Sequence, residues 1–317
     1  MRIFVYEHIT GGGCSGVELD RSLSHEGALM ARALVHDLRE YGAVEVHTTH
    51  DARLNGPPGI ESRAIASPQQ WARVFREQAL KADFIWPIAP ETDGTLAGLS
   101  EHILALGRPL LGSHPSAVRV AGSKRACALA LARVGLPVVP HFESPALAPS
   151  DCPTFVIKPD DGAGCVNTYR LDKLSASRWW QEAGGPRWIC QPYLEGRALS
   201  LSVVWNGRQL RVLSCNEQII RCAGEKLHFE GVRAGVQDAR PYEEIAGLVL
   251  QAIPGLWGYF GIDLIQTHEA VFITEVNPRL TTAYVSLGSE RTLSVAALVL
   301  EGVSSRVCST QREVAHG

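Results

Sequence analysis

The organisation of this 317-residue chain changes near residue 113, and that change limits the folds open to it. Up to residue 112, short apolar runs alternate with segments of helical periodicity. Strands that alternate with helices are typical of a small parallel α/β lobe. From about residue 153, strand-like runs dominate, with helices expected only near 242–253 and 290–301. Such runs indicate an α+β region with antiparallel sheets.

The pattern predicts the individual elements. In the first region we expect strands at 2–7, 44–48, 83–87 and 109–111, and helices at 24–41 (with Ser24 as N-cap), 68–80 and 96–106. One helix is predicted at 117–134, closed by Gly135 and Pro137. The later strand-like runs are 155–158, 188–192, 199–205, 210–214, 218–221, 260–266 and 270–276. We expect three parts: an N-terminal α/β domain (1–112), a small lobe (113–190) and a C-terminal lobe (191–317).

Composition excludes several classes of protein. The formal net charge is -3 and no long basic run occurs, so nothing favours a nucleic-acid partner. No apolar stretch reaches the roughly 18 residues of a membrane span, and the first residues turn acidic too early for a signal peptide. Eight scattered cysteines without a C-x-x-C pair are typical of free thiols in a reducing compartment. We therefore expect a cytoplasmic enzyme.

Gly11, Gly13 and Gly16 satisfy the letters of the G-x-G-x-x-G dinucleotide fingerprint after the first strand. In that fingerprint a helix opens directly on the glycines, so that its amides meet the pyrophosphate. Here residues 17–21 intervene, and Asp51, the best candidate for a ribose contact, lies too far along the chain. We interpret the segment as a flexible Gly-rich loop, or as one that covers a substrate at the carboxyl end of the strand.

Two apolar runs, 258–266 and 270–277, flank a short polar turn and predict a β-hairpin. With the turn centred between them, Asp263 lies opposite Glu275, about 5 Å away on the same face. Asn277 shares that face because it is two residues further on. Opposed like charges destabilise a sheet, and hard oxygen ligands suit Mg²⁺. The hairpin predicts a metal site; the alternative is a solvated polar face.

Two lysines are candidates for phosphate binding. Lys158 ends an apolar strand and precedes a small-residue loop that contains Gly162 and Gly164. A lysine in this place can grip phosphate oxygens while loop amides approach them. Lys124 lies at an expected early helical turn. Either lysine taken alone could instead be a solvent-facing charge.

Two further segments complete the candidate site. Arg279 follows Asn277 on the same alternation, and its side chain can hold a phosphate or carboxylate bidentately. The segment 191–196 ends another apolar strand and connects the lobes, where its backbone groups can meet a planar base. Its candidate residues are Gln191, Tyr193, Leu194 and Glu195.

In this order, the segments resemble the ATP-grasp superfamily of carboxylate–amine ligases over roughly residues 113–300. The matching pieces are Ser123-Lys124, Lys158-Pro159 with its glycine loop, Gln-Pro-Tyr-Leu-Glu-Gly at 191–196, Gly-Ile-Asp at 261–263 and Glu-Val-Asn-Pro-Arg at 275–279. Each piece is weak alone, and the ordered set is specific. The resemblance implies an ATP-grasp fold with an α/β lobe in front of it.

The same resemblance implies roles for the candidate residues. Lys124 and Lys158 would bind the ATP phosphates, and the segment from Gln191 to Leu194 would surround the adenine. Arg279 would lie near an acyl phosphate. One or two Mg²⁺ ions, with Mn²⁺ as an alternative, would be held by Asp263, Glu275 and Asn277. Two positions depart from the superfamily: Pro192 and Ala198 stand where acidic hinge and ribose contacts are common, and Glu195 is the candidate substitute.

A narrower resemblance is to the tyramine–L-glutamate ligase group. It rests on Phe4–Glu7, on Glu26-Gly27 with Met30, on Ala89–Gly94 and on Asn277–Thr282. It implies that the γ-carboxylate of L-glutamate is joined to tyramine through an acyl phosphate, in the biosynthesis of methanofuran-type one-carbon carriers.

Alternatives stay open at this point. The chain could be an ATP-grasp ligase for another acid and amine, or a nucleotide-binding regulatory protein without turnover. The expected partners are small-molecule acid and amine substrates, and a homodimer is one option for assembly. Weaker candidates for substrate contacts, each of which could instead be a cap or a solvated charge, are His25, Glu26, Glu91 and Asp93.

Overall fold

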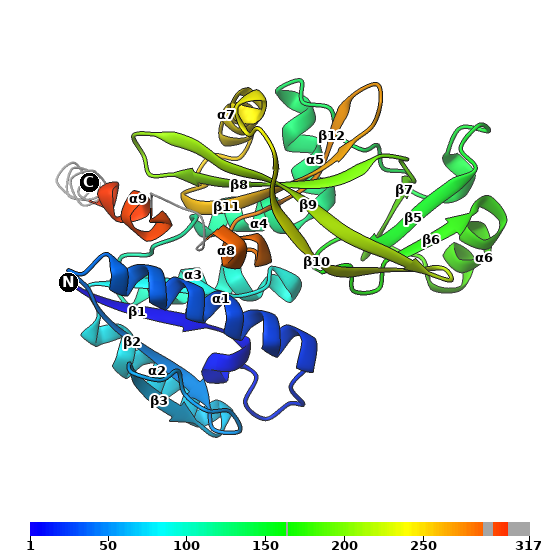
Figure 1. Ribbon diagram of the computed structural model, residues 1–317. Coiled ribbons are helices and arrows are strands. Elements are labelled where there is room, and N and C mark those ends of the chain that lie inside the picture. Colours follow the sequence, from blue (N-terminus) through cyan, green and yellow to red (C-terminus); the bar gives the residue numbers. More distant parts are fainter. Residues whose placement is uncertain (163, 288–293, 304–317) are drawn as a thin grey trace, which may run out of the picture.

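The computed structural model describes residues 1–162, 164–287 and 294–303 (Figure 1). Their strands form a four-stranded parallel sheet and an eight-stranded sheet. All neighbouring strands of the larger sheet are antiparallel. The predicted combination of an α/β lobe with an antiparallel α+β region is therefore confirmed.

The N-terminal lobe is built on the parallel sheet. In spatial order its strands are β3 (Glu61–Ile65), β2 (Glu45–Asp51), β1 (Arg2–Glu7) and β4 (Phe84–Ile88). Its helices are α1 (Arg21–Glu40), α2 (Pro68–Lys81) and α3 (Thr95–Ala105). Val5 packs with Leu34 of α1, whereas Phe4 packs with Phe75 of α2. Because both faces of the sheet are buried, β1 is a continuous apolar run.

Three expectations in this lobe need correction. Helix α1 begins at Arg21 and not at Ser24, because the Asp20 side chain accepts a 2.9 Å hydrogen bond from the backbone N–H of Leu23. Strand β3 was not predicted, since its alternation of charged and small residues lacks an apolar run. The expected strand at 109–111 is reduced to a single bridge between β4 and Leu110.

The glycine-rich segment after β1 is an ordered turn and not a flexible loop. Residues Ile9–Gly13 form one turn of π-helix, η1. The Glu7 carboxylate accepts the backbone N–H groups of Ile9 at 3.0 Å and of Thr10 at 2.6 Å, which fixes the start of the turn. Gly12 has φ +93, a conformation that favours glycine. The glycines thus serve a tight turn.

The larger sheet spans the rest of the molecule (Figure 1). In spatial order its strands are β12 (Val271–Asn277), β11 (Gly258–Gln266), β8 (Arg197–Trp205), β9 (Leu210–Ala223), β10 (Lys226–Gln237), β6 (Tyr169–Asp172), β5 (Thr154–Pro159) and β7 (Trp188–Pro192). Its helices are α4 (Pro115–Gly122), α5 (Lys124–Arg133), α6 (Lys173–Ala183), α7 (Glu243–Ala252), α8 (Thr282–Leu287) and α9 (Val295–Glu301). Residues 290–293 of the predicted last helix lie outside the described residues.

The single helix expected over 117–134 is two helices. Ser123 has extended backbone angles (φ -98, ψ 114), so it ends α4 and begins α5. Its hydroxyl accepts the backbone N–H of Ala126 at 3.1 Å, which caps α5. The break places Lys124 in the first turn of a helix.

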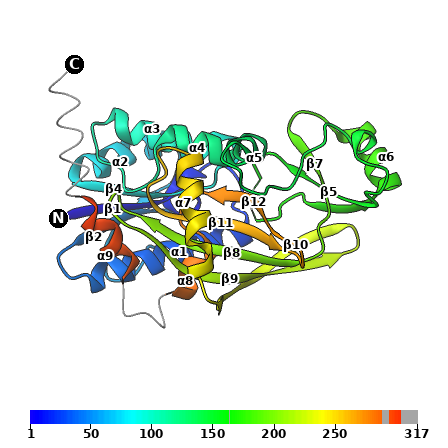
Figure 2. The same ribbon diagram turned by 90° about the horizontal axis from the view of Figure 1, so that it is seen from above.

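A long hairpin of β9 and β10 links the two parts of the large sheet. Figure 2 shows it running from the region of β8 and β11 toward β5 and α6. Strand β10 reaches β6 at the register pair Lys226–Tyr169. Strand β9 is continuous where two strands were expected, and β6, α6 and β10 were not predicted. Polar residues and glycines interrupt the apolar pattern of β10, which explains why that strand was not predicted.

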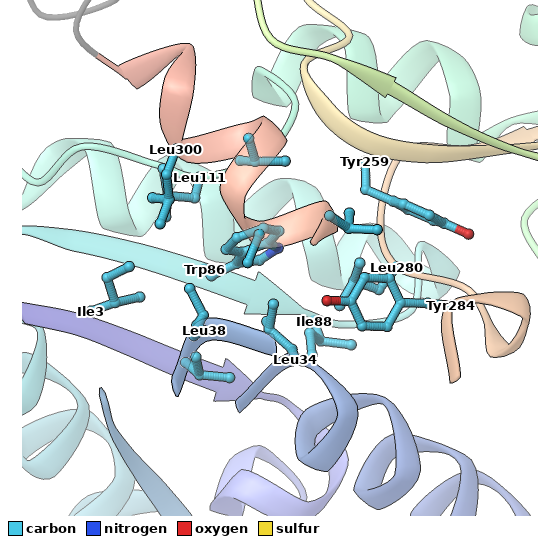
Figure 3. Close-up of a cluster of buried hydrophobic side chains, with 14 of the residues drawn as sticks. Ile3, Leu34, Leu38, Trp86, Ile88, Leu111, Tyr259, Leu280, Tyr284 and Leu300 are labelled. Carbon is cyan, nitrogen blue, oxygen red and sulfur yellow. The ribbon is translucent and has the colours of Figure 1, made fainter. Parts of the chain in front are cut away.

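An apolar core joins the N-terminal lobe to the C-terminal lobe (Figure 3). In it, Leu34 and Leu38 of α1 and Trp86 of β4 pack with Tyr284 of α8 and Leu300 of α9. These side chains are at most 6% exposed. The two lobes therefore share one core and form one packed unit. No helix within the described ranges is long and apolar enough to cross a membrane.

Candidate active site

A cavity of 570 Å³ lies where the lobes meet. The N-terminal lobe lines it with residues of β1, α1 and β4, and the large sheet with residues of β5, β7, β8, β9, β10, β11 and β12. Most of the residues singled out from the sequence line it: Lys124, Lys158, Gly162, Gly164, Gln191, Tyr193, Leu194, Asp263, Glu275, Asn277 and Arg279. The fold thus gathers these candidates, although Lys124 and Arg279 lie 155 positions apart in the chain.

The hairpin of β11 and β12 presents the predicted carboxylates. Asp263 pairs with Glu275 in the register of the two strands, as expected. A bulge follows at once, because Leu264 pairs with Ile273 and leaves Thr274 without a partner. The Asn277 side chain donates a 3.2 Å hydrogen bond from Nδ2 to the Asp263 carboxylate. Two carboxylates and an amide group therefore lie together on the cavity face.

The two carboxyl groups differ in acidity. Burial and the neighbouring charge of Glu275 raise the pKa of Asp263 well above its usual value. Burial opposes the ionised form of Glu275 as well, but the charges of Lys124 and Lys158 lower the pKa of that residue to about 2. One more positive charge would let both carboxylates ionise. A divalent cation fits this donor set, and the oxygen-rich chemistry suits Mg²⁺.

Lys124 is the centre of the internal ion pairing. Its side chain is 7% exposed, and its Nζ lies 3.1 Å from Oε2 of Glu275. The ammonium group also donates to the backbone carbonyl of Gly162 in the glycine loop. Burial disfavours the charged form, but the charge and hydrogen bond of Glu275, together with the charges of Glu91 and Asp160, raise the pKa of Lys124. Lys124 thus stays protonated and connects β12 to the glycine loop.

Lys158 lies on β5, which continues into the glycine loop. It lines the cavity, and burial lowers its pKa. Gly162 and Gly164 line the cavity beyond it, and Gly164 has φ +63, where glycine is favoured. The geometry brings one lysine and a run of small residues to the same wall, as the sequence predicted.

The segment after β7 borders the cavity only in part. Gln191 is 3% exposed, and its amide donates to the carbonyl of Val139 at 3.3 Å. Its Nε2 also lies 3.2 Å from His141 Nε2, and burial lowers the pKa of that histidine to about 4. Tyr193 and Leu194 line the cavity. Glu195 is exposed and does not line it, so the structure offers no contact for that residue.

Arg279 reaches from the C-terminal lobe to the N-terminal lobe. Its Nε and Nη2 donate to Oε2 of Glu91 at 3.0 and 2.8 Å. The two side chains are 12% and 7% exposed. Burial opposes the charge, but Glu91, together with the charges of Glu275 and Asp263, raises the pKa of Arg279. Of the weaker substrate candidates, Glu91 is bound here, while the Asp93 side chain is 73% exposed.

The end of the cavity at the N-terminal lobe combines apolar side chains with two carboxylates. Leu23 and Met30 of α1 line it, as do Glu7 and Glu26. Burial raises the pKa of Glu7 and of Glu26. A Cβ atom on Gly27 would lie 2.6 Å from Cδ of Glu7, so glycine leaves the room that this carboxylate occupies. Of the weaker candidates, Glu26 lines the cavity, whereas His25 is exposed.

The sequence did not point to the contribution of the β9–β10 hairpin. Gln218 and Ile220 of β9 and Leu227 and Phe229 of β10 line the cavity. The available signal was the alternation of Leu227 and Phe229 with polar residues after the turn at Gly224-Glu225. That signal is short, because a bulge after Phe229 shifts the register.

Comparison with known proteins agrees with this geometry. The sequence profile of an ATP-grasp domain matches residues 121–283, and that of a pre ATP-grasp domain matches residues 44–118. A D-alanine–D-alanine ligase of Desulforudis audaxviator is 30% identical over 248 residues, which are 70% of this chain and 79% of that protein. The chain belongs to the ATP-grasp superfamily. Its predicted ATP-grasp fold is therefore confirmed.

Two further relatives bear on the subgroup and on the fold. A tyramine–L-glutamate ligase of Methanocaldococcus fervens is 30% identical over 218 residues, which are 68% of this chain and 64% of that protein. The match thus spans less than two thirds of that relative. A crystal structure of an ATP-grasp superfamily protein from Archaeoglobus fulgidus superposes with a TM-score of 0.74 at 24% identity, over 95% of this chain and 88% of that one.

Proposed function

We propose that this protein is an ATP-dependent ligase that forms an amide bond between the carboxylate of an amino acid and an amine. The observation that carries the proposal is one cavity that holds Lys124, Lys158 and the Asp263–Glu275 pair and extends to Arg279. These residues provide positive charge for phosphates and oxygen ligands for a cation. Membership of the ATP-grasp superfamily supports ATP as the phosphoryl donor.

Under this proposal, the candidate residues of the cavity each bind a part of ATP or its metal ion. Lys124 and Lys158 hold the phosphate oxygens, and the amides of Gly162 and Gly164 cover them. The segment from Gln191 to Leu194 borders the adenine, with Gln191 held in place by its bond to the carbonyl of Val139. Asp263, Glu275 and Asn277 would hold Mg²⁺, which supplies charge neutralisation at the phosphates when bound.

The reaction then proceeds in two displacements. A carboxylate oxygen of the acid attacks the γ-phosphorus of ATP, the bond to ADP breaks, and an acyl phosphate forms. The amine nitrogen next attacks the acyl carbon, phosphate leaves with the former carboxylate oxygen, and the proton of the amine passes to the leaving phosphate. Arg279 stabilises the negative oxygens of the acyl phosphate. The chain mainly positions the reactants and excludes water from the intermediate.

The side chains at the N-terminal end of the cavity are suited to bind an acid and an amine that carry ammonium groups. Glu7 and Glu26 attract a cation, and Leu23 and Met30 offer apolar surface to a hydrocarbon or aromatic body. This chemistry suits tyramine together with L-glutamate joined through its γ-carboxylate. The relative from Methanocaldococcus fervens bears that name, and on this basis we place the reaction in the biosynthesis of a methanofuran-type one-carbon carrier.

A second ligase activity has its own support. The relative from Desulforudis audaxviator is named D-alanine–D-alanine ligase and is covered over 79% of its length, more than the first relative. A small amino-acid pair is therefore the alternative substrate class. The apolar surface of Leu23 and Met30 favours the larger, aromatic amine.

ADP release tests the proposal. Purified protein receives Mg²⁺ and ATP with L-glutamate and tyramine, and each component is omitted in turn. The proposal predicts ADP only with all components present and a product with the mass of glutamyltyramine. ADP that appears only with D-alanine would assign the second activity. Nucleotide binding without ADP release for any pair of a broad panel would favour a regulatory protein and contradict the proposal.

A further inference from the structure

The turn after β4 is shaped by two left-handed residues. Asp93 has φ +53 and Gly94 has φ +69. The backbone N–H of Gly94 donates to the carbonyl of Glu91 at 3.0 Å, and the Thr95 hydroxyl donates to the carbonyl of Thr92 at 2.8 Å. A left-handed aspartate costs free energy, which the surrounding contacts must offset. The residues Glu91–Gly94, here called the junction turn, are thus held in one shape.

One side of the junction turn holds Arg279. Glu91 is 8% exposed, and its Oε2 accepts two N–H groups of the guanidinium. A Cβ atom on Gly122 would lie 3.1 Å from Cβ of Glu91, so the end of α4 leaves room for this side chain. The carboxylate and the guanidinium come from different lobes and neutralise each other in a poorly solvated place. Glu91 therefore fixes where the Arg279 side chain points.

The other side of the junction turn holds the start of the glycine loop. The backbone N–H of Asp93 donates to Oδ2 of Asp161 at 2.9 Å, and the Thr92 hydroxyl donates to the Asp161 carbonyl at 3.2 Å. Asp161 directly precedes Gly162, which lines the cavity. The neighbouring Asp160 binds the first turn of α5 through Ser123 at 2.7 Å. The loop is thus attached at two points before it reaches the cavity.

We infer that the junction turn positions two parts of the active site together: the arginine beside the reacting phosphate and the loop that covers the ATP phosphates. Glu91 is a positioning residue that acts through Arg279, and Asp161 is one that acts through the loop. A shift of the turn moves both, because three consecutive residues carry the two sets of contacts. This inference rests on the proposed function for the roles of the loop and the arginine, but the coupling itself is a property of the protein without ligand.

Hydrogen exchange on the ligand-free protein tests the coupling without any substrate. Asp161→Ala removes the acceptor of the Asp93 amide, and Glu91→Gln removes the charge at Arg279. We expect each variant to speed exchange on both sides, at residues 160–162 and at residues 277–281, by at least about fivefold. The matched control is Arg187→Gln, since Arg187 pairs with Asp93 through side chains that are 80% and 73% exposed. Faster exchange confined to the side of each substitution would overturn the inference.

Kinetics with the substrates from the ADP assay adds the functional test. We expect Glu91→Gln to lower kcat about 10- to 100-fold, as for other residues that orient an active-site group, and also to raise KM for ATP, because the turn transmits the change to the glycine loop. Glu91→Asp keeps the charge and should restore most of kcat. Asp161→Ala should raise KM for ATP about tenfold, the effect of one hydrogen bond to a charged group.

The double variant Glu91→Gln, Asp161→Ala decides whether the two sides are coupled in turnover. Coupled sides predict a loss in kcat/KM that is clearly smaller than the product of the single losses. A loss equal to that product would contradict the inference that the junction turn couples the two sides. If the wild-type protein binds Mg²⁺ and ATP but no substrate pair reacts, the proposed function fails while the exchange result still judges the coupling. Melting temperatures of all variants separate these effects from unfolding.

Discussion

The two ends of the cavity hold their charged groups in different ways. At the end where we propose that the ATP phosphates bind, here called the phosphate end, side chains hold each other: Lys124 pairs with Glu275 at 3.1 Å, and Asn277 donates to Asp263 at 3.2 Å. At the N-terminal end, Glu7 is held by backbone N–H groups of its own turn. The first arrangement must change partners when a ligand enters, whereas the second is already fixed.

This difference has an energetic consequence. Charged groups gathered for a ligand interact unfavourably until the ligand arrives, and the raised pKa of Asp263 reflects that cost. Burial raises the pKa of Glu7 too, but the N–H groups of Ile9 and Thr10 favour its ionised form without any ligand. Substitutions at the phosphate end should therefore change stability as well as activity, whereas substitution of Glu26 at the other end should change substrate affinity alone. The predictions below follow this contrast from the largest effect to the smallest.

Glu275→Gln removes the carboxylate that pairs with the ammonium group of Lys124. We expect the rate of ADP release to fall more than about 100-fold, because a charged oxygen ligand is lost at the transferred phosphate. The free energy of unfolding should fall by roughly 1–3 kcal/mol, since Lys124 loses its buried partner. Steady-state kinetics and urea unfolding measure the two effects. The matched control is Glu269→Gln in the turn of the same hairpin, where the side chain is 79% exposed; full activity of Glu275→Gln would refute the site.

Asp263→Asn should also abolish most activity, but its effect on stability has the opposite sign. The folded protein binds a proton at Asp263 more readily than the unfolded chain does, so stability is lost as the pH rises above the ordinary pKa of an aspartate toward the raised folded pKa. That cost is present at neutral pH and disappears as the pH falls. In metal-free buffer at pH 7, the asparagine should stabilise the fold by up to about 1 kcal/mol. A loss of stability in thermal unfolding would show that the pair is not under strain.

Glu26→Gln probes the N-terminal end. We expect the KM of an ammonium-bearing substrate to rise about tenfold, the effect of one lost charged contact, with KM for ATP unchanged. Glu18→Gln is the control, since Glu18 is exposed and does not line the cavity. Equal changes in KM for ATP and for the amine would mean that the two ends do not act separately.

His141→Gln concerns the support of Gln191, which we propose to border the nucleotide, and should have the smallest effect. Burial lowers the pKa of His141 to about 4 from the ordinary 6.5. The unfolded chain then binds the proton more readily between these values, so the stabilising contribution of His141 is lost as the pH falls from about 6.5 to 4. Urea unfolding across that range should give a shallower pH dependence for the variant. An identical pH profile would show that His141 is not buried as a neutral group.

The same contrast explains how much the sequence could predict. The pairing of Asp263 with Glu275 depends on one hairpin, so strand alternation and the turn were sufficient to find it. Lys158 was found from its place at a strand end beside small residues and Lys124 from an expected helix start, whereas their joint role came from a resemblance, since no local rule brings the two lysines to the same cavity. The partnership of Glu91 with Arg279 spans 188 residues and two lobes, so no pattern along the chain contains it.

The elements of the fold were also predictable where a local pattern marks them and not where distant contacts determine them. Strand β1 and helix α2 were predicted nearly to the residue, because an apolar run and a Ser-Pro cap mark them. Strand β10 escaped prediction, since its pairing with β9 includes two irregularities that break the alternation. The split of α4 from α5 also escaped, because the extended conformation of Ser123 depends on bonds to Asp160, 37 residues away.

The transfer of an oxygen isotope tests the central claim, activation of a carboxylate by ATP, most directly. The acid substrate carries ¹⁸O in its reacting carboxylate, and the phosphate released during turnover with ATP and the amine is analysed by mass spectrometry. If an acyl phosphate forms, one ¹⁸O atom appears in each phosphate, because the carboxylate oxygen leaves with it. Phosphate without ¹⁸O, released together with amide product, would contradict this account.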